Sequence, residues 1–230
     1  MSLLEIGEIA IEGRLVDASN ATLFVVVSHQ GEETRAIYKP VAGERPLWDF
    51  PDGNLASRER AAYLVDQALG FNHIPLTIVR DGPFGIGAVQ QWIDIDESID
   101  LEIFFRKDDP QLREVALLDA VINNTDRKIG HLLPEPSGHL YICDHGVTFH
   151  EEDKLRTVLW QWSGQPLSEL EVIALQDLLR KISGQELEEL NSLLTQGEIA
   201  ALHERINRLL VTGIFPEPNP EWPHIPWPPF

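Results

Sequence analysis

The segment Asn123-Asn124-Thr125-Asp126-Arg127-Lys128-Ile129-Gly130-His131 is the most informative part of the chain. It follows residues 111–122, whose apolar side chains recur at helical spacing, and it precedes two strand-like runs at 131–133 and 140–143. A dense polar loop between apolar elements is where catalytic residues tend to lie. The pattern predicts a helix, a functional loop and a small hairpin, with Asp126 and Lys128 as candidate catalytic residues.

The chain beyond this segment is predicted to be mostly helical. Ser168-Glu169-Leu170-Glu171 fits a capping box, and further helices are expected near Gln185 and Glu198. The tail from Phe215 to Phe230 is rich in proline and tryptophan, so it cannot form a helix. Two interpretations of the tail stay open. It packs back onto the large lobe and buries its aromatic rings, or it docks a partner through them; the rings are those of Trp222, Trp227 and Phe230.

The chain before this segment is predicted to be rich in strands. Three strand patterns, at 4–16, 23–27 and 36–39, precede a loop at 43–53. A helical pattern then runs from Leu55 to Leu69 and stops at Gly70, a good residue for a helix C-terminus. Two more strand-like runs follow near 76–80 and 86–93. The expected order is therefore three strands, one helix and two strands.

The composition shifts near residue 94, and this predicts two lobes. The expected boundaries are 1–93 for a small, strand-rich N-lobe, 94–215 for a larger helical C-lobe, and 216–230 for the tail. A cleft between lobes is where ligands usually bind.

Composition restricts the class of protein. The chain has 230 residues, 43% of them hydrophobic, and a formal net charge of −19. Such acidity disfavours nucleic acid and anionic lipid surfaces as partners, because their phosphates would be repelled. No apolar run is long enough to span a bilayer, so membrane insertion is not expected. The N-terminus has no secretory pattern and Cys143 is the single cysteine, which together predict a cytoplasmic protein.

Phosphoryl transfer needs a cation on the phosphates, acidic ligands for Mg²⁺ and a carboxylate near the attacking hydroxyl. Lys39, at the end of the third strand pattern, could contact phosphates, and Glu59 on the following helix could hold its ammonium. Each residue also has a plain alternative. Lys39 could be an ordinary exposed lysine of a strand, and Glu59 could lie on a solvated face of its helix.

Two acidic residues could supply the other parts. Asp126 could accept a proton from a substrate hydroxyl, and Lys128 could contact the transferred phosphate. Asp144 leaves an apolar strand two residues before Gly146, where it could bind Mg²⁺. Here too there are plain alternatives. The Asp126-Arg127-Lys128 sequence is common on protein surfaces, and Asp144 could simply belong to a turn at the end of a strand.

These motifs, in this order, resemble those of phosphatidylinositol 3-/4-kinase-related proteins. Tyr38-Lys39-Pro40, Asn124-Thr125-Asp126-Arg127 and Asp144-His145-Gly146-Val147-Thr148-Phe149 look like motifs of type II phosphatidylinositol 4-kinases and their bacterial relatives. The chain from residue 5 to 215 is similar to an uncharacterised actinobacterial kinase-like family, of which the string at 43–51 looks typical. The resemblance implies an α+β fold, the bilobed protein-kinase-like fold of atypical kinases, with ATP between the lobes.

The resemblance also implies roles for individual residues. Lys39 would hold the α- and β-phosphates of ATP and pair with Glu59, Asp126 would be the catalytic aspartate, and Asp144 the main Mg²⁺ ligand. The run at 89–93, with Gln91 and Trp92, would face the adenine. The turn at 17–21, with Ser19 and Asn20, would cover the phosphates in place of a glycine-rich loop.

His131 departs from the resembled pattern, because kinases of this kind usually have asparagine there as a second metal ligand. Imidazole suits softer metals than Mg²⁺, so His131 could mean one metal ion, a preference for Mn²⁺, weakened catalysis, or only a structural role. The resulting hypothesis is an ATP- and Mg²⁺-dependent phosphotransferase that acts on a protein or small-molecule hydroxyl. The alternatives are a nucleotide-binding pseudokinase scaffold and an AMP transferase on the same fold.

Overall fold

A five-stranded antiparallel sheet forms one side of the molecule. The computed structural model describes residues 2–15 and 21–230. The sheet has the order β1-β2-β3-β5-β4, and its strands are β1 (Glu8–Arg14), β2 (Leu23–His29), β3 (Glu32–Pro40), β4 (Thr77–Gly82) and β5 (Gly85–Gln91). In β2 the side chains of Leu23, Val25 and Val27 alternate into the core, which is why this run forms a half-buried strand. A short helix, α1 (Leu3–Ile6), lies where a strand was expected to begin.

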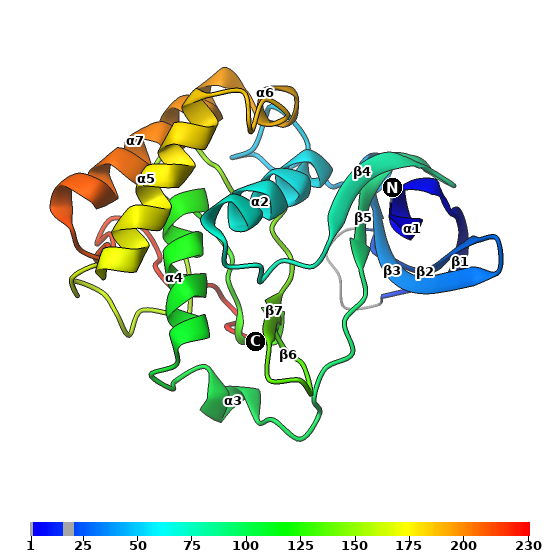
Figure 1. Cartoon of the computed structure of the whole chain (residues 1–230), viewed down its shortest axis with the longest axis horizontal. Coiled ribbons are helices and arrows are strands. Elements are labelled where there is room, and N and C mark those ends of the chain that lie inside the picture. Colours follow the sequence, from blue (N-terminus) through cyan, green and yellow to red (C-terminus); the bar gives the residue numbers. More distant parts are fainter. Residues whose placement is uncertain (1, 16–20) are drawn as a thin grey trace.

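The helix α2 (Leu55–Leu69) lies between the sheet and the other helices (Figure 1). Its start is fixed by Asn54, whose side chain accepts a hydrogen bond from the backbone N–H of Ser57 at 2.7 Å. Its end is fixed by Gly70, which has a left-handed φ of 81°, as the sequence predicted. The apolar face of α2 joins the large core of the helical half, so this helix connects both parts of the molecule.

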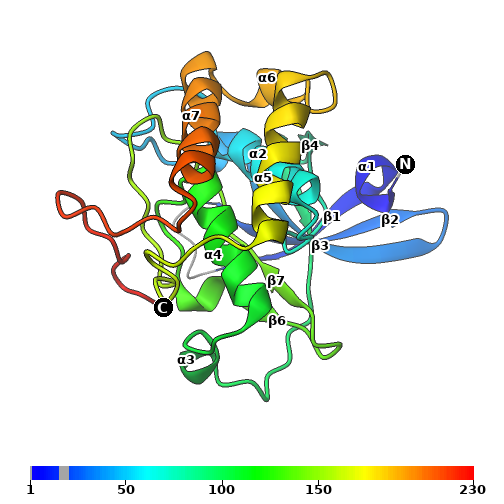
Figure 2. The same ribbon diagram turned by 60° about the vertical axis from the view of Figure 1, so that its left-hand side comes forward.

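Helices make up most of the second half of the chain. They are α3 (Leu101–Phe104), α4 (Pro110–Ile122), α5 (Glu169–Ser183), α6 (Leu190–Leu193) and α7 (Gln196–Thr212). Figure 2 shows α4, α5 and α7 packed side by side, and their apolar faces share one core. A small hairpin of β6 (Leu132–Pro134) and β7 (Leu140–Ile142) closes this core, and two 3-10 turns, η1 (Val41–Gly43) and η2 (Ile129–His131), complete the elements.

Two capping boxes start the long C-terminal helices. The expected box at Ser168 and Glu171 is present, and a second one joins Thr195 to Glu198 at the start of α7. Glu198 has a further partner, because its Oε1 accepts a hydrogen bond from Arg58 Nε of α2 at 2.6 Å. Both side chains are almost fully buried, so this ion pair ties α2 to α7.

Sequence and structure agree on most elements. The α+β fold, the order of three strands, the helix α2 and two strands, the helix at 111–122 and the hairpin after it are confirmed. The helix expected near Gln185 is wrong, since only the four-residue α6 forms there, beginning at Leu190. The boundaries at 93 and 215 stay predictions. No helix among the described residues is both long enough and apolar enough to cross a membrane.

The tail packs back onto the helical half through its backbone, but its rings are not all buried. The Trp227 side chain is 86% exposed and that of Phe230 is 57% exposed. The interpretation in which the tail buries its rings is therefore wrong for these two. Proline has no N–H to donate, so the backbone of this segment is held through its carbonyl groups, which accept from Ile129, Thr157 and Trp160.

The buried pair of Arg58 and Glu198 leads to a stability prediction. Replacement Arg58→Ala leaves the Glu198 carboxylate buried without its cation, and we expect the free energy of unfolding to fall by about 3–5 kcal/mol. The measurement is urea unfolding followed by circular dichroism.

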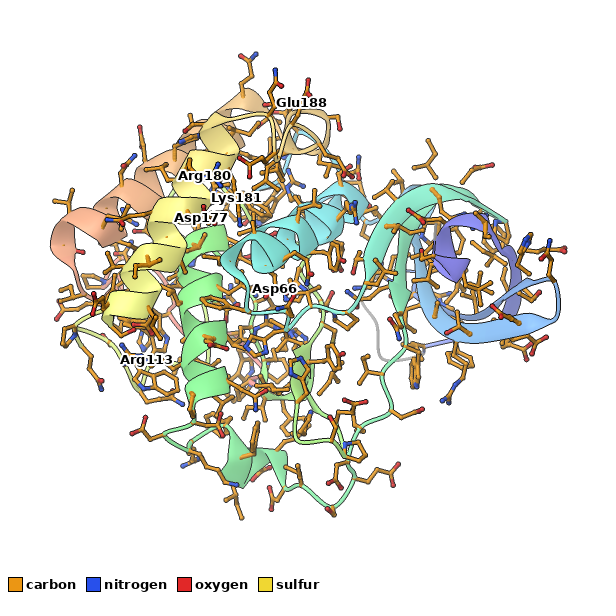
Figure 3. All side chains as sticks on the ribbon, viewed as in Figure 1. Asp66, Arg113, Asp177, Arg180, Lys181 and Glu188 are labelled. Carbon is orange, nitrogen blue, oxygen red and sulfur yellow. The ribbon has the colours of Figure 1, made fainter. Side chains whose placement is uncertain are left out.

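A matched control is Arg180→Ala on α5. Arg180 pairs with Asp177 and Glu186 at the surface, and Figure 3 shows Asp177, Arg180 and Lys181 together on this helix. Exposed ion pairs are screened by water and salt, so this variant should unfold close to wild type. Equal losses for the two variants would contradict the structural role of Arg58.

Candidate functional site

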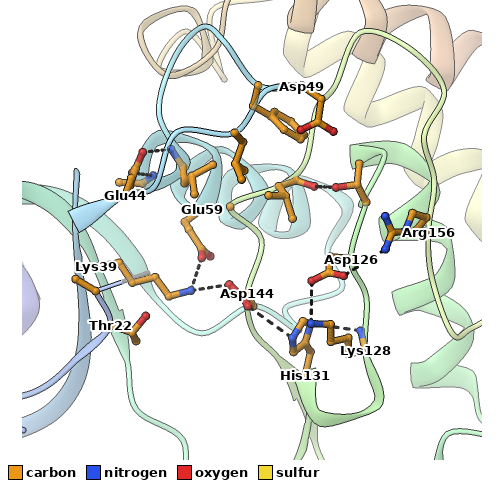
Figure 4. Close-up of a pocket in the computed structure, with 18 of the residues that line it drawn as sticks. Thr22, Lys39, Glu44, Asp49, Glu59, Asp126, Lys128, His131, Asp144 and Arg156 are labelled. Atoms are coloured by element: carbon orange, nitrogen blue, oxygen red, sulfur yellow. Dashed lines mark hydrogen bonds and ion pairs between the residues drawn. The ribbon is translucent and has the colours of Figure 1, made fainter. Parts of the chain in front are cut away.

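A pocket of about 600 Å³ lies between the sheet and the helical half. Its walls come from the end of β3, the start of α2, the loop after α4, the segment after β7 and the tail. Figure 4 shows Lys39, Glu59, Asp126, Lys128, His131 and Asp144 around this space. The six residues predicted for catalysis, for the lysine pair and for metal binding therefore come together, although they are spread over 106 residues of sequence.

Lys39 pairs with two carboxylates. Its Nζ donates a hydrogen bond to Glu59 Oε1 and another to Asp144 Oδ1, the second at 3.1 Å. Burial alone would lower the pKa of Lys39, but Asp144 and Glu59 outweigh it and raise that pKa above its usual range. The Lys39 ammonium in turn holds the pKa of Asp144 well below its usual range. At neutral pH Lys39 is therefore a cation held between two carboxylates.

The backbone of Asp144 has an unusual conformation. It follows β7 directly after Cys143, and its φ is +65°, a left-handed value that few residues other than glycine adopt. Such conformations concentrate at functional sites, where the surrounding structure holds them. Gly146, two residues on, packs so close to α2 that an added Cβ would lie 3.0 Å from Leu55 Cβ. The segment thus turns sharply against α2 and presents the Asp144 carboxylate to the pocket.

A buried network fixes the two loops that bear the aspartates. Arg127 is fully buried and donates hydrogen bonds to the Asp119 carboxylate, with Nη2 at 3.0 Å from Oδ1, and to the Cys143 carbonyl at 2.9 Å. Arg127 Nη2 also lies 2.7 Å from His145 Nε2. Arginine only donates, so Nε2 of His145 is the acceptor and its proton is on Nδ1.

His145 connects this network to the lysine pair. Its backbone N–H donates to Glu59 Oε2 at 3.0 Å, and its Nδ1 lies 3.8 Å from the same oxygen. Burial lowers the pKa of His145 well below its usual range, and the nearby Arg127 adds to this effect. His145 is therefore neutral, and it joins Arg127 to Glu59 without a charge of its own.

Asp126 lies on the loop after α4. The helix ends at Asn123, which is in the left-handed region, and the Asn124 side chain accepts the backbone N–H of Asp126 at 3.0 Å. The Asp126 carboxylate is 3.2 Å from Lys128 Nζ and 4.0 Å from Arg156 Nη2. Burial raises the pKa of Asp126, although Lys128 acts in the opposite direction. A carboxylate with a raised pKa is a better proton acceptor.

His131 contacts Asp144, with 3.6 Å between Nε2 and Asp144 Oδ2. Its Nδ1 accepts the backbone N–H of Lys128 at 3.3 Å, so a neutral ring has its proton on Nε2, directed toward Asp144. Burial lowers the pKa of His131 to about 4. Binding a metal through Nε2 would require the other tautomer and the loss of the Lys128 contact. This geometry favours His131 as a neighbour that orients Asp144.

The pocket suits Mg²⁺ bound together with phosphate oxygens. Among residues 2–15 and 21–230, no three side chains of the metal-binding types converge on their own. Mg²⁺ in nucleotide sites is usually held by one or two carboxylates, water and the phosphates of the substrate. The Asp144 carboxylate, exposed to the pocket and ionised at neutral pH, has the donor chemistry for that role.

Some predicted positions are not brought to the pocket. Gln91 and Trp92 are absent from its lining. The Trp92 ring packs against Phe24 instead, with ring centroids 5.0 Å apart, and the backbone N–H of Gln91 donates to the Leu76 carbonyl. Their assignment to adenine therefore has no support from this geometry. Ser19 and Asn20 lie outside the described residues.

Sequence reasoning missed several residues of the site. Arg156 faces Asp126 and no sequence motif marks it. His145 and Arg127 were quoted within motifs, but nothing in the pattern indicated that they would be hydrogen-bonded to each other. Glu44 lies in the quoted string at 43–51, and its carboxylate accepts the N–H groups of Leu55 and Ala56 at the start of α2.

Cys143 lies beside the site but is a poor nucleophile. Burial raises the pKa of its thiol to about 12, and Asp144 adds to this effect. Because the reactive form of cysteine is the thiolate, this residue stays largely inert near neutral pH. The chemistry of the pocket therefore depends on the lysines and carboxylates.

Comparison with known proteins supports a kinase-like fold. The structure is similar to that of the Helicobacter pylori proinflammatory kinase CtkA, with a TM-score of 0.50 and 12% sequence identity over 91% of this chain and 93% of that one. The Golgi casein kinase gives a TM-score of 0.48 at 15% identity, over 91% of this chain and 72% of that one. The likeness to CtkA establishes the bilobed, kinase-like α+β fold.

One curated protein is similar along the entire chain. Protein Rv2133c of Mycobacterium tuberculosis is 39% identical over 264 aligned residues, which cover 100% of this chain and 95% of that protein. No protein-family model matches the chain.

The lowered pKa of His131 predicts how stability depends on pH without added metal. Unfolded His131 binds a proton near pH 6.5, whereas the folded form resists until about pH 4. The contribution of His131 to the free energy of unfolding is therefore fully present above about pH 6.5, and it is lost as the pH falls from there through about 4. In His131→Asn the loss of stability between pH 7 and 4 should therefore be smaller, by on the order of 3 kcal/mol.

The measurement is urea unfolding at a series of pH values. His203→Asn, on α7, is the matched control and should keep the wild-type profile. Parallel profiles for wild type and His131→Asn would show that His131 is not held neutral by burial.

Proposed function

The chain belongs to the family of protein Rv2133c, and we propose that it is an ATP-dependent phosphotransferase that acts on a protein or small-molecule hydroxyl. The main support is the convergence of Lys39, Glu59, Asp126 and Asp144 in one pocket of a kinase-like fold. These residues supply a cation for phosphates, its carboxylate partner, a proton acceptor and a metal ligand, the parts that phosphoryl transfer needs.

We further propose a relationship to phosphatidylinositol 3-/4-kinases, limited to the catalytic machinery. Its support is the set of motifs around Lys39, Asp126 and Asp144. A lipid acceptor is not part of the proposal, because a net charge of −19 opposes an approach to anionic membranes. A cytoplasmic location stays a prediction from the single cysteine.

In this proposal Lys39 binds the α- and β-phosphates of ATP. Its Nζ is held by Glu59, which His145 and the Arg127 network fix in turn. A preorganised ammonium loses little entropy on binding and needs no reorganisation during the reaction. Mg²⁺ held at Asp144 would neutralise charge on the phosphates when bound.

Asp126 acts on the acceptor. The acceptor oxygen forms a bond to the γ-phosphorus while the bond from that phosphorus to the β–γ bridging oxygen breaks, and ADP leaves. Asp126 accepts the proton of the acceptor hydroxyl, for which its raised pKa suits it. Lys128, 3.2 Å from Asp126, is placed to contact the transferred phosphate.

A nucleotide-binding pseudokinase is the second candidate. The observation in its favour is His131, which stands where asparagine usually binds a second metal and instead directs a proton toward Asp144. Transfer of AMP on the same fold is the third candidate. It is distinguished from phosphoryl transfer by whether a label on the α-phosphate or on the γ-phosphate of ATP reaches the acceptor.

Turnover is the first test of the phosphotransferase. With γ-labelled ATP and either Mg²⁺ or Mn²⁺, wild type should release or transfer label, and Asp126→Asn should lower the rate by a factor of about 10²–10⁴. Asp153→Asn removes a surface carboxylate paired with Arg208 and is the matched control, which should retain wild-type turnover. Transfer of an α-label instead would identify an AMP transferase. Turnover that survives Asp126→Asn would refute the catalytic assignment.

ATP binding is tested separately by thermal stability. Because a ligand bound to the folded state stabilises it by mass action, ATP with Mg²⁺ at 100 times its Kd should add about 2.7 kcal/mol. Lys39→Ala should remove most of this gain. Stabilisation without any turnover would favour the pseudokinase, whereas no stabilisation in wild type would count against both candidates.

A further inference from the structure

The tail, residues 216–230, lies along the loop that bears Asp126. The backbone N–H of Ile129 donates to the Pro229 carbonyl at 2.8 Å, and the N–H of Thr157 donates to the His224 carbonyl at 3.1 Å. Figure 2 shows this segment leaving α7 and ending beside the lower part of the helical half. Three segments far apart in sequence therefore run together next to Asp126.

Two tail residues also reach the pocket itself. Trp222 and Phe230 both line the space that contains Asp126 and Lys39. The Phe230 ring lies 3.7 Å from the position that a Cβ on Gly130 would occupy. The loop at 128–131 and the segment at 154–157 flank Asp126, and the tail contacts both.

The tail is held partly by its side chains, since the Lys154 ammonium lies 5.1 Å from the centre of the Trp222 ring and the His224 ring meets Trp160 edge to face, and partly by contacts that any extended polypeptide could make. Ile129 and Thr157 donate backbone N–H groups, and Trp160 adds its indole Nε1–H to the His224 carbonyl at 2.9 Å. The tail supplies only carbonyl oxygens to these donors. Main-chain pairing of this kind gives affinity for an extended peptide whatever its side chains are.

The tail has no hydroxyl side chain that could accept a phosphoryl group. From residue 216 to 230 the sequence is PEPNPEWPHIPWPPF, without serine, threonine or tyrosine. A segment that occupies an acceptor groove but lacks a hydroxyl blocks the groove without being consumed.

Much of the tail faces solvent. Its side chains are largely exposed: Ile225 is 47% exposed and Trp227 is 86% exposed. Pro226 is the tail side chain that is buried. Release of the tail would therefore uncover Pro226, whereas Ile225 and Trp227 already face solvent.

We propose that the groove along Ile129 and Thr157 is the acceptor site of this protein, and that its substrate is an extended polypeptide with a serine, threonine or tyrosine hydroxyl. The tail is an intramolecular occupant that the substrate displaces. This inference rests on the proposed function and selects the polypeptide from its two acceptor classes. The hydroxyl oxygen of the peptide takes the γ-phosphoryl group of ATP, ADP leaves, and Asp126 takes the proton.

The test uses the full chain with the tail loosened. Pro226→Asp places a charge at a buried tail position and should release the segment, whereas Pro220→Asp makes the same change at an exposed tail position. The assay follows γ-label from ATP into dephosphorylated casein. At low casein concentration we expect Pro226→Asp to transfer label to casein about tenfold faster than wild type. This factor is the one expected if the tail occupies the groove of the wild-type protein about ten to one over the free state. Pro220→Asp should match wild type, and the KM for ATP should not change.

The outcomes separate the two claims. A folded Pro226→Asp that hydrolyses ATP but labels casein no faster than Pro220→Asp would overturn this inference and leave the proposed function standing. No ATP binding or turnover in any variant would mean that the proposed function itself fails.

A second full-length variant decides the matter if Pro226→Asp does not fold. Trp222→Ser places a hydroxyl on the tail inside the pocket, and label should then appear on residue 222, located by mass spectrometry. Val211→Ser, at an exposed position of α7, is the matched control and should stay unlabelled. A folded Trp222→Ser that hydrolyses ATP without labelling itself would overturn the inference.

Discussion

The buried ion pair of Arg127 and Asp119 is the interaction on which the site depends. Both side chains are fully buried, and a buried pair is favourable only when nearly all its donors and acceptors are satisfied. Here α4 supplies Asp119, the loop after α4 supplies Arg127, and the Cys143 carbonyl beside Asp144 accepts another hydrogen bond from the guanidinium. One side chain thus fixes the relative positions of the loops that present Asp126 and Asp144.

The same network reaches the sheet through His145 and Glu59. A neutral imidazole suits this position, because it accepts from Arg127 without adding a second buried cation. The His145 backbone then holds Glu59, and Glu59 holds Lys39 on β3. Lys39 and the loop that bears Asp126 therefore belong to one connected structure, although they lie in different halves of the molecule.

Local patterns in the sequence predicted most of the elements and, together with the resemblance to known kinases, pointed to six residues that line the pocket. Helix periodicity, the capping residues at Ser168 and the strand end at Asp144 act over a few neighbours, so one sequence can reveal them. Arg156 and the contact between His145 and Arg127 depend on packing between distant segments, which has no local signature. The exposed Trp227 was mispredicted because an aromatic ring suggests burial, whereas a proline-rich backbone is held by its carbonyls.

The protonated thiol of Cys143 has a practical consequence. Near pH 8 a thiol whose pKa is about 12 is deprotonated in on the order of one molecule in ten thousand. Maleimide dyes, which react with the thiolate, therefore label it slowly. A second cysteine placed on an exposed surface would take up a fluorophore selectively, without removal of the native one. The protein is in this sense already prepared for single-site labelling, and one dye on the C-terminal segment would report on its surroundings without a change to the pocket.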